Sequence, residues 1–194
     1  IMLTGGLGFI GSHTAIELIN KGYSVFIIDN LSNSSESVVE DIKAITGKEV
    51  FFCEGDIRDE LMVGRFLQAN EIDSVVHFAG SKSVNESVSA PLHYYDNNVI
   101  GTISLLKAMT RHGIKNLIFS SSASVYGDPK YTPIDESHPL NPTNPYAQTK
   151  KQSEEIILDC ATSDSEWKTI ILRYFNPVGS HSSGLIGENP RGIP

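Results

Sequence analysis

Residues 4–12 read TGGLGFIGS and place glycines at positions 5, 6, 8 and 11. The preceding residues 1–3 form an apolar stretch typical of a strand, and residues 9–20 have the apolar spacing of a helix. The glycines fit the pattern GxGxxG from Gly6 and the pattern GxxGxxG from Gly5. Such a turn lets a pyrophosphate approach bare backbone at the start of a helix. The stretch therefore predicts the first strand, turn and helix of a dinucleotide-binding fold.

The order of elements along the rest of the chain extends this prediction. Short apolar segments alternate with longer segments of helical spacing, which is typical of parallel strands covered by helices on both faces. The predicted strands are residues 1–3, 24–28, 49–53, 74–78, 116–120 and 169–173. The predicted helices are residues 9–20, 35–46, 59–69, 90–112 and 145–162. The expected fold is a doubly wound α/β sheet of the Rossmann type.

The two ends of the sequence favour a piece of a longer protein. Residues 1–175 are expected to form the dinucleotide-binding domain, and residues 176–194 the start of a substrate-binding region. This tail is rich in glycine and proline and contains no predicted element. The first strand is shorter than a buried strand normally is. We therefore expect that most of a smaller, substrate-binding lobe is missing from the sequence.

Composition and charge exclude several classes of function. The chain of 194 residues is 40% hydrophobic and 20% charged, and its net charge of −8 argues against a nucleic-acid surface. Cys53 and Cys160 lack the spacing of a metal or redox site and are expected to be core residues in a reducing compartment. His13 and His77 lie at element edges and are expected to be structural. With no signal peptide and no apolar run of about 18 residues, we expect a soluble cytoplasmic protein without a metal site.

Polar and small residues follow the second, third and fourth predicted strands, at the edge where open α/β sheets bind ligands. Asp29 follows the second strand, where a carboxylate accepts hydrogen bonds from both ribose hydroxyls and repels a 2′-phosphate. Asp29 therefore favours NAD over NADP. The residues after the next two strands are Asp56, Ile57, Phe78, Ala79, Gly80 and Lys82. The first pair is placed to hold the adenine, the next three let a cofactor lie close, and the lysine adds positive charge near the phosphates.

A serine, a tyrosine and a lysine form the candidate reactive group. Tyr146 follows Pro145, which suits the first turn of a helix, and Lys150 lies four residues further on the same face. A nearby ammonium, together with a positively charged nicotinamide, stabilises a phenolate and lowers the pKa of Tyr146, which lets it act as a base. Ser122, just past the fifth predicted strand, is placed to hydrogen-bond the same substrate hydroxyl.

Taken together, these motifs resemble the extended short-chain dehydrogenase/reductase family. The segments that carry the resemblance are TGGLGFIGSH, DNLSNS, EGDIRD, HFAGSKSV, YYDNNVIGT, FSSSASVYGD, NPYAQTK and LRYFNPVGSH. They cover essentially the whole chain, in the order and at about the spacing that the family shows.

The resemblance implies a role for each matching residue. The residues implied in NAD binding are Gly5, Gly8, Phe9, Ile10, Gly11, Asp29, Asn30, Asn33, Asp56, Ile57, Phe78, Ala79, Gly80, Lys82, Asn97, Tyr146, Lys150 and Tyr174. The residues implied in substrate binding are Ser122, Tyr146 and Asn176, the last as a contact of a uridine diphosphate. The implied catalytic residues are Ser122, Tyr146 and Lys150.

Within the family, the chain resembles the members that epimerise UDP-hexoses at C4. This implies an isomerase of galactose metabolism that interconverts UDP-glucose and UDP-galactose with NAD, forms a homodimer through helices 90–112 and 145–162, and is inactive as a fragment. Three alternatives stay open. A nucleotide-sugar 4,6-dehydratase needs an acid/base pair where this chain has Ala123 and Ser124, and a nucleotide-sugar decarboxylase needs a carboxylated substrate. A non-catalytic NAD-sensing module has no need of the three catalytic residues.

Overall fold

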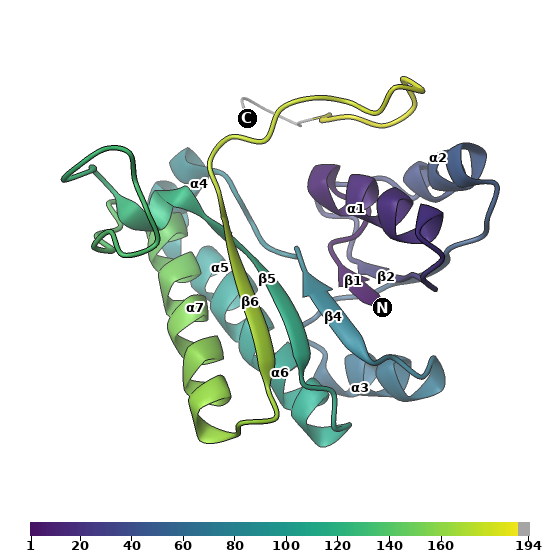
Figure 1. Ribbon diagram of the computed structural model, residues 1–194, viewed down its shortest axis with the longest axis horizontal. Coiled ribbons are helices and arrows are strands. Elements are labelled where there is room, and N and C mark those ends of the chain that lie inside the picture. The colour runs from purple at the N-terminus through teal and green to yellow at the C-terminus, as the bar shows by residue number, and fades with distance from the viewer. Residues whose placement is uncertain (190–194) are drawn as a thin grey trace.

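The computed structural model describes residues 1–189 and contains a parallel sheet of six strands. In sheet order, the strands are β3 (Phe51–Glu54), β2 (Phe26–Asp29), β1 (Met2–Thr4), β4 (Ser74–His77), β5 (Asn116–Ser122) and β6 (Lys168–Tyr174) (Figure 1). The strand order reverses between β1 and β4, as it does in doubly wound folds. The structure therefore confirms the predicted fold.

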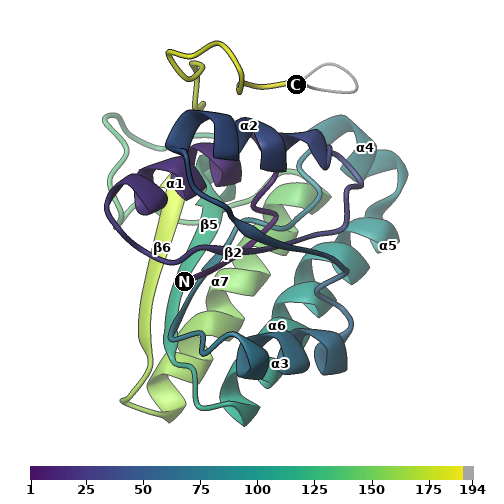
Figure 2. The same cartoon turned by 90° about the vertical axis from the view of Figure 1, so that its right-hand side faces the viewer.

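Helices cover both faces of the sheet. The main helices are α1 (Phe9–Asn20), α2 (Ser37–Thr46), α3 (Glu60–Ala69), α6 (Gly101–Arg111) and α7 (Pro145–Ser163). One hydrophobic cluster contains Ile16 of α1 and Ile42 of α2. A second cluster contains Leu67 of α3, Leu105 of α6 and Ile157 of α7, the three helices that Figure 2 shows side by side. The two clusters form the core, one on each face of the sheet.

The segment between β4 and β5 departs in detail from its prediction. Its four helical stretches are α4 (Val84–Ser89), α5 (Pro91–Tyr94), the π-helical η1 (Tyr95–Ile100) and α6. The single helix expected over residues 90–112 therefore has a π-helical middle, a feature that often marks functional sites. α4 lies outside the predicted helices. The Ser83 hydroxyl accepts a hydrogen bond from the Glu86 amide (3.3 Å) at its start, so the Ser-x-x-Glu pattern is a signal that could have predicted it.

The carboxyl ends of the strands meet at one edge of the sheet. Thr4 pairs with Ile28 on one side and with His77 on the other, and Ser122 pairs with Tyr174. β5 extends beyond the predicted segment, so Ser122 is the last residue of the strand and not a residue just past it. Pairing with β6 fixes the backbone of Ser122, and the 3-10 turn η2 (Ala123–Tyr126) follows directly.

His77 is a buried structural residue, as expected. Its Nδ1 lies 2.7 Å from the Thr4 hydroxyl oxygen, and its Nε2 lies 3.0 Å from the Thr102 hydroxyl oxygen. Burial lowers the pKa of His77 to about 3, so the ring is neutral at physiological pH. The residue ties the centre of the sheet to α6.

Residues 176–189 form an irregular segment after β6, with one isolated bridge between Ser180 and Gly187. The segment passes over the edge of the sheet toward α1 (Figure 1). It agrees with the irregular tail expected over residues 176–194, of which 190–194 lie outside the described residues. Cys53 and Cys160 are free thiols, partly buried against the core. Within residues 1–189, no helix has both the length and the apolar character needed to cross a membrane.

Candidate active site

The glycine turn after β1 has a backbone shape that side chains would prevent. Gly5 has a φ of +66°, and a Cβ added there would lie 2.7 Å from the Ala79 amide nitrogen. A Cβ on Gly11 would lie 2.5 Å from the Gly5 carbonyl oxygen. These two glycines therefore let β1, α1 and the loop after β4 approach one another closely.

Gly8 differs from the other glycines of the turn. A Cβ on Gly8 would meet one neighbour, the Gly5 carbonyl oxygen, at an ordinary 3.4 Å. Packing therefore does not require a glycine there. Gly8 is also the N-cap of α1, and the helix has no side-chain cap and no acidic residue in its first turn. The amides that follow, at Phe9 and Ile10, begin a helix whose N-terminus suits an anion.

Asp29 ties the glycine turn to the loop after β2. Its buried carboxylate accepts hydrogen bonds from the Leu7 amide (3.1 Å), the Leu31 amide (3.0 Å) and the Ser34 hydroxyl (2.7 Å). Asn30, in the same loop, donates to Asp56 at 3.3 Å. The structure thus brings three predicted residues of the ribose and adenine region together. Asn33, the fourth, is exposed on this loop.

Asp56 is held by a neighbouring arginine. Arg58 donates from Nε (3.0 Å) and from Nη2 (2.7 Å) to the two oxygens of the Asp56 carboxylate, and it also pairs with Asp96 at the start of η1. The hydrogen bonds from Arg58 lower the pKa of Asp56 to about 2. The carboxylate therefore stays ionised. The side chain of Ile57, beside it, is buried in the core against Gly101.

The loop after β4 is fastened to η1 and α7 by Asn98, a residue that the sequence analysis does not single out. The Asn98 side chain accepts a hydrogen bond from the Ser81 amide (2.8 Å) and donates to the Ser81 carbonyl (3.1 Å) and the Thr149 hydroxyl (3.0 Å). The predicted residue Asn97 donates to the Ser81 hydroxyl at 3.1 Å. Nothing in the run of two asparagines indicates which one faces the core.

Gly80 in this loop lies directly against Lys150, the lysine of the predicted catalytic group. A Cβ on Gly80 would lie 3.5 Å from Lys150 Nζ and 3.2 Å from the side-chain oxygen of Asn98. Phe78 and Ala79, the preceding two residues, lie against the glycine turn, because their backbone is what a Cβ on Gly5 would meet. The loop therefore connects the glycine turn to Lys150.

Tyr146 and Lys150 lie on the first turns of α7, as predicted. Pro145 occupies the first helical turn, and the Asn144 side chain accepts a hydrogen bond from the Ala147 amide (2.9 Å) as the N-cap. Lys150 Nζ is buried and donates to the Ser120 carbonyl of β5 at 2.8 Å. Desolvation lowers the pKa of Lys150 to about 8.

Tyr146 faces Ser122, and the chain by itself supplies only part of what the expected acidity of its phenol needs, because that expectation includes a positively charged nicotinamide. Burial raises the pKa of the Tyr146 phenol, and a hydrogen bond with Ser122 lowers it by less. The groups of the chain itself therefore do not make the phenol acidic, because the Lys150 ammonium is directed to the Ser120 carbonyl. Ser122 also accepts hydrogen bonds from the amide (3.2 Å) and hydroxyl (2.9 Å) of Ser124.

Three further predicted residues lie at the same edge of the sheet or just beyond it. Tyr174 is partly buried at the end of β6, opposite Ser122 in the strand register. Asn176 is exposed two residues later. Lys82 donates to Glu188 of the tail at 2.6 Å. The predicted site is thus an open edge crossed by the segment after β6.

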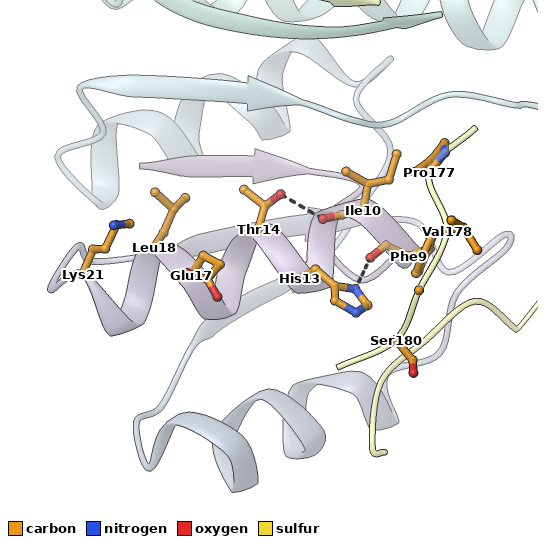
Figure 3. Close-up of a pocket in the computed structure, with 11 residues that line it drawn as sticks. Phe9, Ile10, His13, Thr14, Glu17, Leu18, Lys21, Pro177, Val178 and Ser180 are labelled. Carbon is orange, nitrogen blue, oxygen red and sulfur yellow. Dashed lines mark hydrogen bonds between the residues drawn. The ribbon is translucent and has the colours of Figure 1, made fainter. Parts of the chain in front are cut away.

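A separate cavity of about 470 Å³ lies on the outer side of α1 (Figure 3). Its walls are α1 and residues 177–180, and Figure 3 shows His13 directed toward that segment. His13 Nδ1 lies 2.7 Å from the Phe9 carbonyl oxygen, and its buried Nε2 has no hydrogen-bond partner among residues 1–189. The cavity includes Phe9 and Ile10 but is lined by none of Ser122, Tyr146 and Lys150, so it is separate from the predicted catalytic group.

Known proteins match this chain along essentially its whole length. A family model described as GDP-mannose 4,6 dehydratase matches residues 2–191. UDP-glucose 4-epimerase of Bacillus subtilis is 53% identical over 194 residues, which cover 100% of this chain and 57% of that protein. UDP-glucose 4-epimerase of Dictyostelium discoideum is 55% identical, with 100% and 56% covered. The chain therefore spans little more than half the length of these relatives.

Solved structures give the same picture. UDP-glucose 4-epimerase from Bifidobacterium longum, in complex with NAD+ and UDP, has a TM-score of 0.97 and 52% identity and covers 100% of this chain and 58% of its own. The enzyme from Brucella ovis, in complex with NAD, has a TM-score of 0.90 and 41% identity, with 97% and 55% covered. The chain is similar to UDP-glucose 4-epimerases, and it belongs to the family described as GDP-mannose 4,6 dehydratase.

Proposed function

We propose that the complete protein to which this chain belongs is an NAD-dependent isomerase of galactose metabolism that interconverts UDP-glucose and UDP-galactose. The observation that carries the proposal is the convergence of Ser122, Tyr146 and Lys150 at one end of a loop that also contacts the glycine turn. Gly80 lies against Lys150, and Ala79, one residue earlier, lies against Gly5. The relatives whose sequences are 53% and 55% identical to this chain are UDP-glucose 4-epimerases, which supports the same activity.

The residues at the sheet edge fit NAD. The packing of the chain does not require a glycine at position 8. The open space beside Gly8 therefore suits the close approach of a pyrophosphate. The carboxylate of Asp29 is placed to accept hydrogen bonds from the ribose hydroxyls, and its charge repels the 2′-phosphate of NADP. Asp56, which Arg58 keeps ionised, is placed to accept a hydrogen bond from the amino group of adenine. Two of the similar structures contain NAD, which supports the assignment.

The catalytic residues divide the chemistry among themselves. Bound NAD supplies an acceptor that takes a hydride from C4 of the sugar and gives it back, so that no net oxidation occurs. Tyr146 takes the proton of the 4-hydroxyl at its phenolate oxygen and returns it later. Ser122 hydrogen-bonds the same hydroxyl and orients it. The Lys150 ammonium, together with the positive charge of the nicotinamide, stabilises the Tyr146 phenolate against the effect of burial.

Inversion at C4 requires that the sugar be free to turn. Binding energy concentrated on the uridine diphosphate, with Asn176 as one contact, leaves the 4-keto sugar without tight restraints of its own. The keto sugar rotates about its diphosphate, so that the hydride returns to the opposite face of C4, and Tyr146 returns the proton to the 4-oxygen. The residues that surround the sugar's far side lie in the part of the protein beyond this chain, and we expect the chain of 194 residues alone to be inactive.

The description of the matched family names a 4,6-dehydratase, which is the second candidate. Loss of water from C5 and C6 needs an acid and a base beside the reacting hydroxyl. The two residues that follow Ser122 are Ala123 and Ser124, and the Ser124 hydroxyl is bound to Ser122. Because neither side chain is an acid or a base at neutral pH, this position favours epimerisation.

We further propose a homodimer formed through the helices on the α7 side. Exposed apolar side chains gather on these elements: Val88 on α4 (64% exposed), Leu92 on α5 (82%), Ile100 on η1 (47%) and Leu158 on α7 (49%). The four elements adjoin, because α4, α5 and η1 all contact α7. Glu in place of Leu92 should convert a dimer into a monomer in light scattering. The matched control is Leu61→Glu on α3, which should leave the dimer intact.

The test of the function is product identification. The complete protein with NAD is incubated with UDP-galactose, and the nucleotide sugars are separated. We expect UDP-glucose to form. The final ratio of UDP-glucose to UDP-galactose should be the same whichever of the two sugars starts the reaction. A keto-deoxy sugar would assign the protein as a dehydratase, and NAD binding without any product would favour the sensing module.

The two free cysteines suit a reducing compartment, which supports our placement of the protein in the cytoplasm.

A further inference from the structure

A buried carboxylate stands one helical turn beyond Lys150. Glu154 on α7 is 1% exposed, although the sequence KKQSEE around it reads like a solvated helix. Its neighbour Glu155 is exposed and lies 3.7 Å from Lys151. Burying a carboxylate is unfavourable unless it is paired and hydrogen-bonded. The surroundings of Glu154 therefore have to supply both.

Two residues from neighbouring strands hold the Glu154 carboxylate. Arg173 on β6 donates from Nε to Oε1 (3.0 Å) and from Nη2 to Oε2 (2.7 Å), the two-pronged geometry in which arginine binds carboxylates most strongly. Ser121 on β5 donates from its hydroxyl to Oε1. Arg173 also donates from Nη1 to the Tyr126 hydroxyl at 3.0 Å. The cluster thus joins α7 to β5, β6 and η2.

The same stretch of β5 holds the catalytic residues of α7. Ser120, before Ser121, accepts the hydrogen bond from Lys150 Nζ at 2.8 Å. Ser122, after it, hydrogen-bonds Tyr146. Consecutive residues of one strand therefore bind three residues of one helix, with Glu154 as the third. A shift of α7 along β5 would disturb all three contacts together.

The charge of Glu154 acts on Lys150 in the opposite direction to burial. Desolvation lowers the pKa of Lys150 to about 8, and the Glu154 carboxylate raises that pKa. The ionisable groups nearby on other elements are His77 on β4 and Arg173 on β6. His77 is neutral, with a pKa of about 3, and Arg173 is positive and opposes the effect of Glu154. Tyr146, on the same helix, has a raised pKa and is a neutral phenol.

Two more tyrosines complete the ionisable surroundings of the catalytic pair. The Tyr94 ring on α5 packs edge-on against Tyr146, and burial raises the pKa of Tyr94. Tyr126 on η2 accepts the hydrogen bond from Arg173. Within residues 1–189, Glu154 is thus the charged group that favours the ammonium form of Lys150.

We propose that Glu154 is a positioning residue for the catalytic pair: held by Arg173 and Ser121, it fixes α7 against β5 and keeps the Lys150 ammonium charged beside Tyr146. The kinetic consequence rests on the proposed epimerase function. The charge of Lys150 is measurable without turnover, so the two ideas are tested separately.

The first test is the pH profile of kcat in the complete protein with NAD. Glu154→Gln keeps the shape, removes the negative charge and leaves Arg173 positive. We expect the alkaline limb, where Lys150 loses its proton, to move to lower pH by about one unit, with the acid limb unchanged. Arg173→Gln breaks the same ion pair but keeps the carboxylate, so the alkaline limb should move to higher pH. Glu155→Gln, with the same change of charge at an exposed site, should not move either limb.

Opposite shifts are what distinguish a role in charge from a role in packing. If both variants lower kcat by the same factor at every pH without moving a limb, Glu154 acts through packing alone and the proposal is overturned. If Glu154→Gln fails to fold, the upward shift in Arg173→Gln still has to appear, and its absence rejects the proposal.

The second test needs no substrate. The complete protein is labelled with ¹³C at the lysine ε carbons, and the Lys150 signal is identified by its loss in Lys150→Arg. We expect the titration midpoint of Lys150 to fall in Glu154→Gln and to rise in Arg173→Gln. If the wild-type protein does not epimerise UDP-galactose but these midpoints move as expected, the proposed function fails and the role of Glu154 stands. Unchanged midpoints would reject that role even in an active epimerase.

Discussion

At the glycine end of the site, residues 5–11 with Asp29, the shape is fixed by backbone packing. At the end that carries the proposed catalytic residues Ser122, Tyr146 and Lys150, which we call the catalytic end, the shape is fixed by side-chain hydrogen bonds and buried charges. A Cβ on Gly5 would strike the Ala79 amide, whereas Lys150 is held by a carbonyl on β5 and by the charge of Glu154. The first kind of constraint is local and steric, and the second joins residues far apart in the chain.

This difference predicts how each end fails. A change at the glycine end should damage folding or cofactor binding while leaving proton transfer alone. A change at the catalytic end should damage proton transfer while the fold and the bound cofactor persist. Both expectations apply to the complete protein with NAD.

Tyr146→Phe tests the catalytic end at its reactive atom. Removing the phenol oxygen removes the base, so kcat should fall by about 10³-fold, within the range that general base catalysis contributes. The affinity for NAD and the free energy of unfolding should stay close to those of the wild type. Tyr131→Phe, at an exposed tyrosine between η2 and α7, is the matched control and should retain full activity. Equal losses in both variants would contradict the role given to Tyr146.

Gly5→Ala and Gly8→Ala divide the glycine end into its two functions. Gly5→Ala forces a side chain into a left-handed backbone and against Ala79, so the free energy of unfolding should fall by about 3 kcal/mol. Gly8→Ala meets no close neighbour and should change stability by less than about 1 kcal/mol, while NAD affinity falls by about tenfold or more because the methyl group lies where the pyrophosphate approaches. Urea unfolding and NAD titration measure the two effects. Identical stability losses would remove the distinction between these glycines.

Lys150→Met tests the buried charge through the pH dependence of stability. The pKa of Lys150 is about 8 in the folded chain, and in the unfolded chain it has its ordinary value of 10.5. Between these values the unfolded chain binds more protons, so the stability of the wild type rises with pH in that window. From pH 7.5 to 9.5, the wild type should gain about 1–2 kcal/mol relative to Lys150→Met. Lys151→Met, at a more exposed lysine, is the control. Parallel curves of stability against pH for the wild type and Lys150→Met would show that burial does not lower the pKa of Lys150.

Arg58→Met gives the smallest expected effect. It removes a partly exposed ion pair, so the free energy of unfolding should change by less than about 1 kcal/mol. Because Asp56 loses its support, NAD affinity should fall by less than about tenfold, and the pKa of Asp56 should rise from about 2 toward its ordinary value. An NAD titration and an NMR titration of the carboxylate check both outcomes. A large loss of stability would mean that Arg58 is part of the core.

The same contrast explains what the sequence could predict. The glycine turn, the doubly wound parallel sheet and the placement of Tyr146 and Lys150 on one helix follow from the sequence pattern, and the structure confirms them. The exposure of Glu155 and the burial of Glu154 do not follow, because both lie in the same charged run and the partner Arg173 comes from another strand. For the same reason Asn98, held by Ser81 and Thr149, gave no local signal.

Two details were also beyond a sequence pattern. The π-helical η1 lies inside a segment of ordinary helical spacing, so nothing in the sequence marks it. The acidity expected for Tyr146 rests on the Lys150 ammonium and a positively charged nicotinamide, and it leaves out desolvation, which depends on how deeply the fold buries the phenol. Burial is a property of the whole structure, and in the chain alone it raises the pKa of Tyr146 by more than the hydrogen bond with Ser122 lowers it.

The role of Tyr146 as the base is decided by a titration of its phenol, followed as the phenolate absorbance of the wild type minus that of Tyr146→Phe, with and without NAD. Without NAD, burial keeps the pKa of Tyr146 above 10. We predict that NAD lowers the midpoint well below 10 in the wild type, and that Lys150→Met loses most of this decrease because one of the two positive charges is gone. A midpoint that NAD leaves unchanged would contradict the account.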